Sequence, residues 1–134
     1  MNPDPGQNNE GHRLTESVNR FEHMLAHQDQ YYFDVSDLEE LIDHYMDRLD
    51  LDKAWKVLEL ASSQHPHSSE FELKRAEILS LKGEFKKAMK SIRLLESIAP
   101  NNPEMLITKG SIFSKTGKHK QAIEIFNRAL EGIE

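Results

Sequence analysis

The chain has 134 residues, 30% of them charged, and a formal net charge of −6. This mildly acidic balance argues against a dedicated nucleic-acid or membrane-surface binder, because both usually carry a basic excess. Cysteine is missing from the sequence, which excludes disulfides and thiolate chemistry. No apolar run approaches the roughly 20 residues of a membrane span, and the start lacks a basic and apolar leader, so we expect a cytoplasmic protein.

The two halves of the chain differ in charge. Residues 1–68 contain 5 basic and 14 acidic side chains, a net of −9, whereas residues 69–134 contain 12 basic and 9 acidic ones, a net of +3. Such asymmetry bears on association rather than on fold.

The N-terminal third predicts one helix outside any repeat. Residues 1–12 are rich in Pro, Gly and Asn and are expected to be a disordered tail. Residues 13–34 are expected to form a packing helix, ending near Gln28, and a connection. The helix is predicted from apolar residues that share one face: Leu14, Val18, Phe21 and Leu25.

Small residues and helix breakers then recur at a fixed spacing of about 34 residues. The middle of the chain carries Ala76, Gly83, Ala88 and Pro100, and one period further on stand Gly110, Gly117, Ala122 and Glu134. A fixed period in this range indicates stacked structural units. We predict an all-α solenoid of three helix-turn-helix units, residues 35–68, 69–102 and 103–134.

Each unit is expected to contain an A helix and a B helix. The predicted A helices cover about 36–48, 69–82 and 103–116, and the predicted B helices about 51–64, 85–98 and 119–132. With the N-terminal helix this makes seven. Capping boxes are expected at Ser36 with Glu39 and at Ser69 with Glu72, and a cap at Asn102.

The turn between A and B carries glycine in two units. Gly83 and Gly117 suit the left-handed conformation that ends a helix. Leu49 stands at this position in the first unit, where a left-handed backbone costs roughly 1 to 2 kcal/mol, so we expect that turn to be rebuilt around Asp50.

Small residues also indicate where helices approach closely. Ala76 with Ala88, and Gly110 with Ala122, lie twelve residues apart on the two helices of a hairpin. Trp55 is expected to face the core together with Ala54, Leu58 and Ala61. In the last helix, Ile123, Phe126 and Leu130 are expected to be half covered at best.

This pattern resembles the tetratricopeptide repeat, an α-α superhelix of stacked helical hairpins. The third unit is most similar, through Gly110, Phe113, Gly117, Ala122, Phe126 and Ala129. The first unit departs most, with Ile42 and Leu49 in place of the small residue and the turn glycine. The resemblance implies a right-handed superhelix and suggests that the chain is the N-terminal piece of a longer array.

The resemblance also implies a function, which is non-catalytic protein binding in a concave groove lined by A helices. The positions carried over to this groove are Glu39, Asp43, Met46, Asp47, Leu73, Glu77, Ser80, Leu81, Ile107, Ser111, Ser114 and Lys115. Family members that clamp a C-terminal carboxylate use Lys and Asn where this chain has Glu39 and Asp43. We therefore expect a basic or apolar partner segment, although a solvated helix face explains the same charges.

The sequence signals for metal binding, catalysis and nucleic-acid binding are weaker. His23 and His27 have the i, i+4 spacing of zinc ligands, but no third ligand is placed, so we expect surface histidines and no metal. No nucleophile, phosphate loop or carboxylate pair anchors catalysis, and no cofactor is expected. The basic residues Lys82, Lys86, Lys87, Lys90 and Arg93 form the best nucleic-acid candidate, but they lack stacking aromatics and favour a solvated face.

A scaffold role through self-association is the second hypothesis. The acidic half of one chain could meet the basic half of another, or the apolar C-terminal helix could pair with a second copy. We expect no nucleic-acid or membrane partner.

Overall fold

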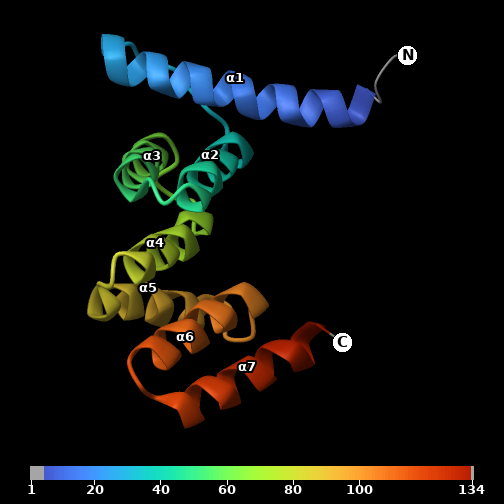
Figure 1. The fold of residues 1–134 in the computed structure, drawn as a ribbon, viewed down its shortest axis with the longest axis vertical. Helices are drawn as coiled ribbons and strands as arrows, with labels where there is room; N and C mark the ends of the chain where they lie inside the picture. Colours follow the sequence, from blue (N-terminus) through green and yellow to red (C-terminus); the bar gives the residue numbers. More distant parts are fainter. Residues whose placement is uncertain (1–4, 134) are drawn as a thin grey trace. The chain divides into compact units, whose positions relative to one another are not determined.

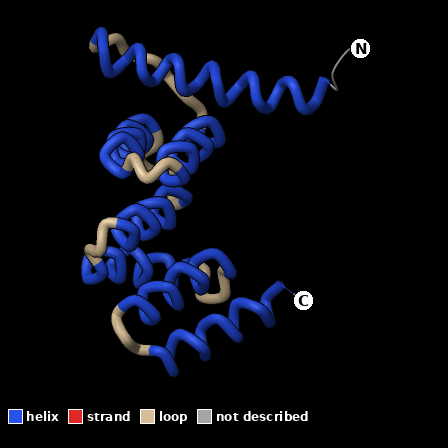
Figure 2. Tube along the Cα trace, in the orientation of Figure 1, coloured by secondary structure: helices blue, strands red, loops and turns tan. Residues whose placement is uncertain are grey.

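The computed structural model describes the backbone of residues 5–133 and the side chains of residues 11–132. In these residues the chain is an all-α helical repeat fold with seven helices and no strand (Figures 1 and 2). The helices are α1 (Pro5–His27), α2 (Val35–Asp47), α3 (Leu51–Gln64), α4 (Glu70–Leu81), α5 (Phe85–Ile98), α6 (Pro103–Lys115) and α7 (His119–Ile133). The chain divides into two compact units between His67 and Ser68.

In the first unit, α1 packs on α2, and α2 pairs with α3 as an antiparallel hairpin (Figure 1). The core of this unit consists of side chains that are at most 2% exposed: Phe21, Phe33, Leu38, Leu41, Ile42, Ala54, Val57, Leu58 and Ala61. Trp55, which we expected in the core, is only half-buried, and Val57 takes the buried position. The rest of the predicted face of α3 is confirmed, since Ala54, Leu58 and Ala61 are buried.

Helix α1 begins earlier than predicted. Residues 5–12 belong to the expected disordered tail, but the structure makes them helical from Pro5, while residues 1–4 lie outside the described part. Proline is well suited to a first helical position because its missing N–H would have no partner there. No further proline follows before His27, so the helix continues without a break.

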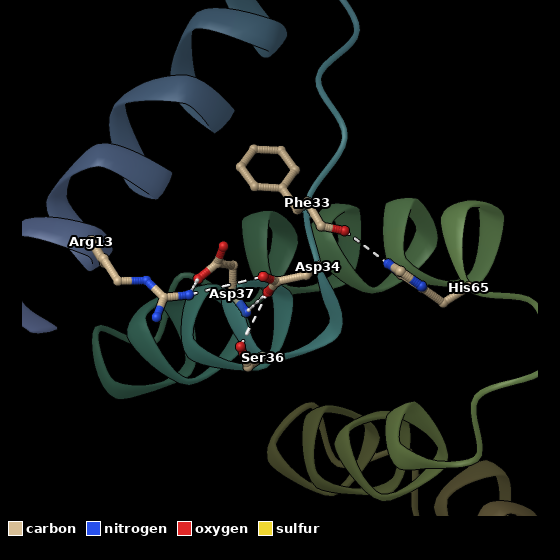
Figure 3. Close-up of polar contacts among 6 residues, drawn as sticks. All are labelled: Arg13, Phe33, Asp34, Ser36, Asp37 and His65. Atoms are coloured by element: carbon tan, nitrogen blue, oxygen red, sulfur yellow. Dashed lines mark hydrogen bonds and ion pairs between the residues drawn. The ribbon is translucent and has the colours of Figure 1, made fainter.

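Figure 3 shows how α1 and the connection attach to the hairpin. Arg13 donates to Asp37 at 3.0 Å, and its guanidinium lies 3.9 Å from Asp34. At the same end of the hairpin, Nε2 of His65, just after α3, donates to the carbonyl oxygen of Phe33 at 2.8 Å. The connection is thus tied to both helices.

Neither predicted capping box forms. Asp34, and not Ser36, caps α2: its carboxylate accepts from the backbone N–H of Asp37 at 2.9 Å and from the Ser36 hydroxyl at 3.1 Å. A carboxylate is the stronger acceptor, and the bond from the Asp37 N–H holds the pKa of Asp34 below its ordinary value. Ser69 has a helical backbone and makes no side-chain cap bond. Asn102 caps α6 as predicted, accepting from the N–H of Met105 at 3.1 Å.

The three A-to-B turns share one backbone geometry. The N–H of the residue after the left-handed position bonds a carbonyl five residues back: Asp50 to Tyr45 at 2.9 Å, Glu84 to Leu79 at 2.9 Å and Lys118 to Phe113 at 2.8 Å. This is the Schellman closure of a helix. These three bonds recur with the same period as the small residues.

Our expectation for the first turn was wrong, because Leu49 adopts the left-handed conformation itself, with φ +57°. Gly83 and Gly117 have φ +79° and +83° at the equivalent positions. Asp50 caps α3 by accepting from the N–H of Lys53 at 3.2 Å. The first hairpin therefore keeps the common turn despite the strain at leucine.

In the second unit, the hairpins α4/α5 and α6/α7 pack so that both α4 and α5 touch α6 (Figure 1). Ala76 and Ala88 are fully buried, in agreement with a close approach of α4 and α5. Gly110 packs against the ring of Phe126, since a β-carbon there would lie 2.6 Å from the ring. The glycine in α6 thus makes room for an aromatic side chain of α7.

A polar cluster fixes α1 to the first hairpin. Glu22 accepts from the Tyr45 hydroxyl at 2.6 Å and from the Lys53 ammonium at 2.9 Å. The hydrogen bond from Tyr45 and the ion pair with Lys53 lower the pKa of Glu22 from its ordinary value of 4.5, and burial with the bond to Glu22 raises the pKa of Tyr45.

We predict that Leu49→Gly stabilises the protein. Leu49 is 71% exposed, so its removal loses little burial, and relief of left-handed strain exceeds the added entropy of an unfolded glycine. The free energy of unfolding should rise by about 0.5 to 1 kcal/mol in urea titrations. A matched Lys56→Gly change in the helical interior of α3 should lower it by about 1 kcal/mol. A loss of stability in Leu49→Gly would contradict the turn geometry.

We predict that Glu22→Gln weakens the docking of α1 in a pH-dependent manner. The lowered pKa means that the carboxylate stabilises the fold above about pH 4.5 and loses this contribution as the pH falls through the lower folded value. Because Glu22 is partly exposed, the loss near pH 7 should be only about 1 kcal/mol. Thermal unfolding by circular dichroism at neutral and at acidic pH should show that the gap between wild type and variant narrows as the pH falls below about 4.5. An equal gap at both pH values would exclude the charge as the cause.

Candidate functional site

The predicted groove residues occupy four positions of the A helices that recur from one repeat to the next. These sets are Glu39, Leu73 and Ile107; Asp43, Glu77 and Ser111; Met46, Ser80 and Ser114; and Asp47, Leu81 and Lys115. The first member of each set lies on α2 in the first unit, and the other two lie on α4 and α6 in the second unit. Within the second unit, α4 and α6 pack together, so their two faces adjoin.

Exposure separates these positions. Met46 and Ser80 are buried, at 8% and 6% exposed, and Leu73 is 9% exposed. A partner could reach little of them. By contrast, Leu81 is 43% and Ile107 is 48% exposed. The accessible apolar surface on the A helices of the second unit is therefore centred on two residues.

The same A-helix faces of the second unit also carry polar residues. Lys115 and Ser114 are exposed on α6, and Glu77 on α4 and Ser111 on α6 are half-buried. The face of the second unit thus mixes both signs of charge.

The face of α2 is acidic. Asp47 is exposed, whereas Glu39 and Asp43 are half-buried and engaged in further interactions. These carboxylates give the first unit a negative A-helix face, as the sequence indicated.

The histidine pair does not build a metal site in the described residues, where no group of three potential ligands gathers. The rings of His23 and His27 lie 4.3 Å apart between centroids. Nδ1 of His23 lies 3.3 Å from both an Asp29 carboxylate oxygen and the Tyr31 hydroxyl. The pair therefore packs the end of α1 against the connection.

Two large apolar side chains of α7 are exposed, as expected. Ile123 and Leu130, seven residues apart on one helix face, are each 60% exposed. Phe126 is half-buried, with its ring against Gly110.

Sequence reasoning missed a hollow beside the basic residues of α5. Lys86, Lys90 and Arg93 border a cavity whose apolar wall includes Phe113 of α6. Phe113 lies twenty residues or more from each of them in sequence, so no local pattern joins them. The sequence did contain one signal for this hollow, which is the pair of apolar residues Phe85 and Met89, four residues apart within the basic stretch.

Helical hairpins that repeat with a fixed period, each reversed by a left-handed residue, define a class of helical repeat proteins whose neighbouring units pack on one another. Residues 103–131, which span α6 and most of α7, match the family model of the tetratricopeptide repeat. This hairpin of the chain is therefore similar to the tetratricopeptide repeat family. A comparison with curated proteins finds no match.

Members of this family generally act as non-catalytic modules that bind protein partners. Among the described helices, none has both the length and the hydropathy that crossing a bilayer requires.

Proposed function

We propose that this chain binds a peptide or partner segment on the A-helix faces, without catalysis. The observation that carries the proposal is the exposure of Ile107 and Leu81 on two helices that pack together in the second unit. Ile107 belongs to the matched repeat. Exposed apolar residues on a folded surface with a polar surround are typical of protein interaction sites.

The chemistry of the face favours a segment with apolar anchors and basic flanks. Apolar side chains of the partner would cover Ile107 and Leu81, and Glu77 on α4 would attract a basic residue more than an acidic one. In the first unit, the carboxylates of α2 favour the same charge on their own face. Binding should therefore weaken with salt without being abolished, because the apolar part is not screened.

The test uses peptides selected from a random display library on the wild-type protein. Titration calorimetry of a selected peptide should show at least about tenfold weaker binding to Ile107→Glu, which is about 1.4 kcal/mol. The matched control is Ile98→Glu on α5, an isoleucine that is 65% exposed against 48% for Ile107, which should change affinity less than about twofold. Leu73 is a poor test position, since burial makes Leu73→Glu a folding mutation.

Equal loss of affinity in both variants, or in neither, would move the binding site away from the A helices. A selected peptide that is acidic and binds independently of salt would overturn the electrostatic part of the proposal.

Self-association through α7 is the second candidate function, favoured by the exposure of Ile123 and Leu130. Two such faces can bury apolar surface against each other at about 25 cal/mol per Å². This candidate is separate from charge pairing between the acidic and basic halves.

Light scattering across protein concentration and salt distinguishes these routes. An apolar α7 contact predicts a dimer that persists in high salt and becomes a monomer in Ile123→Glu, with Ile98→Glu as control. Dissociation by salt alone would indicate charge pairing, since screening weakens it. A monomer at every concentration would exclude both. Phe126 is not the residue to change, because its ring fills the space beside Gly110.

A further inference from the structure

A cavity of about 470 Å³ opens between α5 and α6, within the second unit. Its apolar wall includes Phe85 and Met89 from α5 and Ile112 and Phe113 from α6. The volume lies in the range of ligand pockets, about 300 to 1,000 Å³. It is large enough for one or two bulky side chains.

Basic side chains border this apolar wall. Lys86, Lys90 and Arg93 lie on one face of α5 at i, i+4 and i+7, and Lys118 follows α6. No acidic side chain lines the cavity among the residues that the structure describes. Four positive charges therefore meet at one rim.

The cations of α5 are available to a ligand. In the part of the chain that the structure describes, Lys86, Lys90 and Arg93 make no ion pair, whereas their neighbour Lys87 pairs with Glu84 at 3.5 Å. Like charges at i, i+4 repel each other. An anion at this rim would relieve that repulsion.

The ring of Phe113 links the two parts of the site. The ammonium of Lys118 lies 5.7 Å and that of Lys109 lies 5.8 Å from its centroid, within the range of cation–π attraction. Lys109 is also held by an ion pair with Glu96 of α5. Lys118 is exposed and has no acidic partner among the described residues, so it can reach a carboxylate while it remains near the ring.

We propose that this cavity is a second binding site, for an acidic peptide segment that inserts a bulky apolar side chain between α5 and α6. The inserted side chain contacts Met89 and Phe113, and flanking carboxylates pair with Lys90, Arg93 and Lys118. Charge complementarity selects the partner, and the apolar insertion fixes its position.

An acidic peptide fits these observations better than a nucleic acid. Binding of single strands uses exposed aromatic side chains along a basic track, but Phe85 and Phe113 are both half-buried. The chain as a whole carries a net charge of −6, which opposes a polyanion more than a short acidic segment.

The site is distinct from the A-helix face. Ile107 and Thr116 are nine residues apart, roughly two and a half helical turns, and therefore point to opposite sides of α6. Thr116 lines the cavity. The partner chemistry is also opposite, since the A-helix face favours basic segments.

The experiment measures fluorescence anisotropy of a labelled synthetic heptapeptide that has a central leucine–phenylalanine pair between acidic residues. The wild-type protein should bind it saturably, and Lys90→Glu/Arg93→Glu should weaken binding by at least about tenfold. The matched control reverses two exposed lysines elsewhere, Lys56→Glu/Lys120→Glu, with the same net charge change, and should weaken binding less than about threefold. Circular dichroism confirms that both variants are folded.

Two further arms test the apolar insertion. Replacing the leucine–phenylalanine pair by two serines should weaken binding at least about fivefold, and Met89→Ala should weaken the original peptide more than the serine peptide. Ile107→Glu should leave binding unchanged, so failure of this site and failure of the proposed A-helix site are distinguishable.

Other results would overturn the proposal. Equal loss in the two double variants would show unspecific charge attraction, and equal affinity for the serine peptide would show that the cavity is not entered. Tighter binding of a single-stranded oligonucleotide at the same residues would assign the site to nucleic acid. A salt-sensitive dimer that Lys90→Glu/Arg93→Glu dissociates would assign it to a second copy of the chain.

Discussion

The left-handed residue that ends each A helix is the constraint on which the rest of the structure depends. At Leu49, Gly83 and Gly117 the chain reverses within a few residues. In every hairpin, the residue that follows the left-handed one donates its backbone N–H to the carbonyl oxygen five residues before it. The reversal sets the two apolar helix faces against each other. In the first hairpin it permits burial of Leu38, Leu41, Ile42, Val57 and Leu58. Burial contributes about 1.5 to 3 kcal/mol for each of these side chains, so it outweighs roughly 1 to 2 kcal/mol of strain at leucine.

Once the turn is fixed, the small residues determine how closely the helices pack. In the second unit, Ala76 and Ala88 leave no side-chain bulk between α4 and α5. In the last hairpin the solution differs, because Gly110 accommodates the ring of Phe126. Glycine within a helix costs about 1 kcal/mol relative to alanine, and the buried part of an aromatic ring offsets this cost. The packing of α6 against α7 thus depends on a small residue, Gly110, that faces a large one, Phe126.

The seven helices and the turns between them could be predicted from the sequence, because the spacing of apolar residues along a helix and the glycines in the turns are local signals. The bounds of α3 and α5 agree with the prediction. The errors arise where alternatives compete over a few residues or where tertiary contacts decide. Asp34 replaces Ser36 as a cap because its carboxylate is the stronger acceptor for the N–H of Asp37, and Arg13 from a different helix lies 3.9 Å from it. Leu49 takes the strained conformation because the whole hairpin supports it, and Trp55 is half-buried whereas Val57 is buried. A single-helix pattern contains neither effect.

The candidate binding surfaces depend even more on contacts between helices, which the sequence pattern of a single helix does not contain. Register placed twelve residues on the A-helix faces, but only packing reveals that Ser80 is buried while Leu81 beside it is accessible. The hollow between α5 and α6 requires Met89 and Phe113, which lie on different helices, to share one wall. Helix α6 consequently contributes to both surfaces, with Ile107 on one side and Phe113 and Thr116 turned away from it. A change in its packing against α5, where Lys109 pairs with Glu96, would alter the cavity directly and the A-helix face only through the rotation of α6. Partner binding at the two surfaces is therefore coupled only to the extent that α6 moves as a rigid helix.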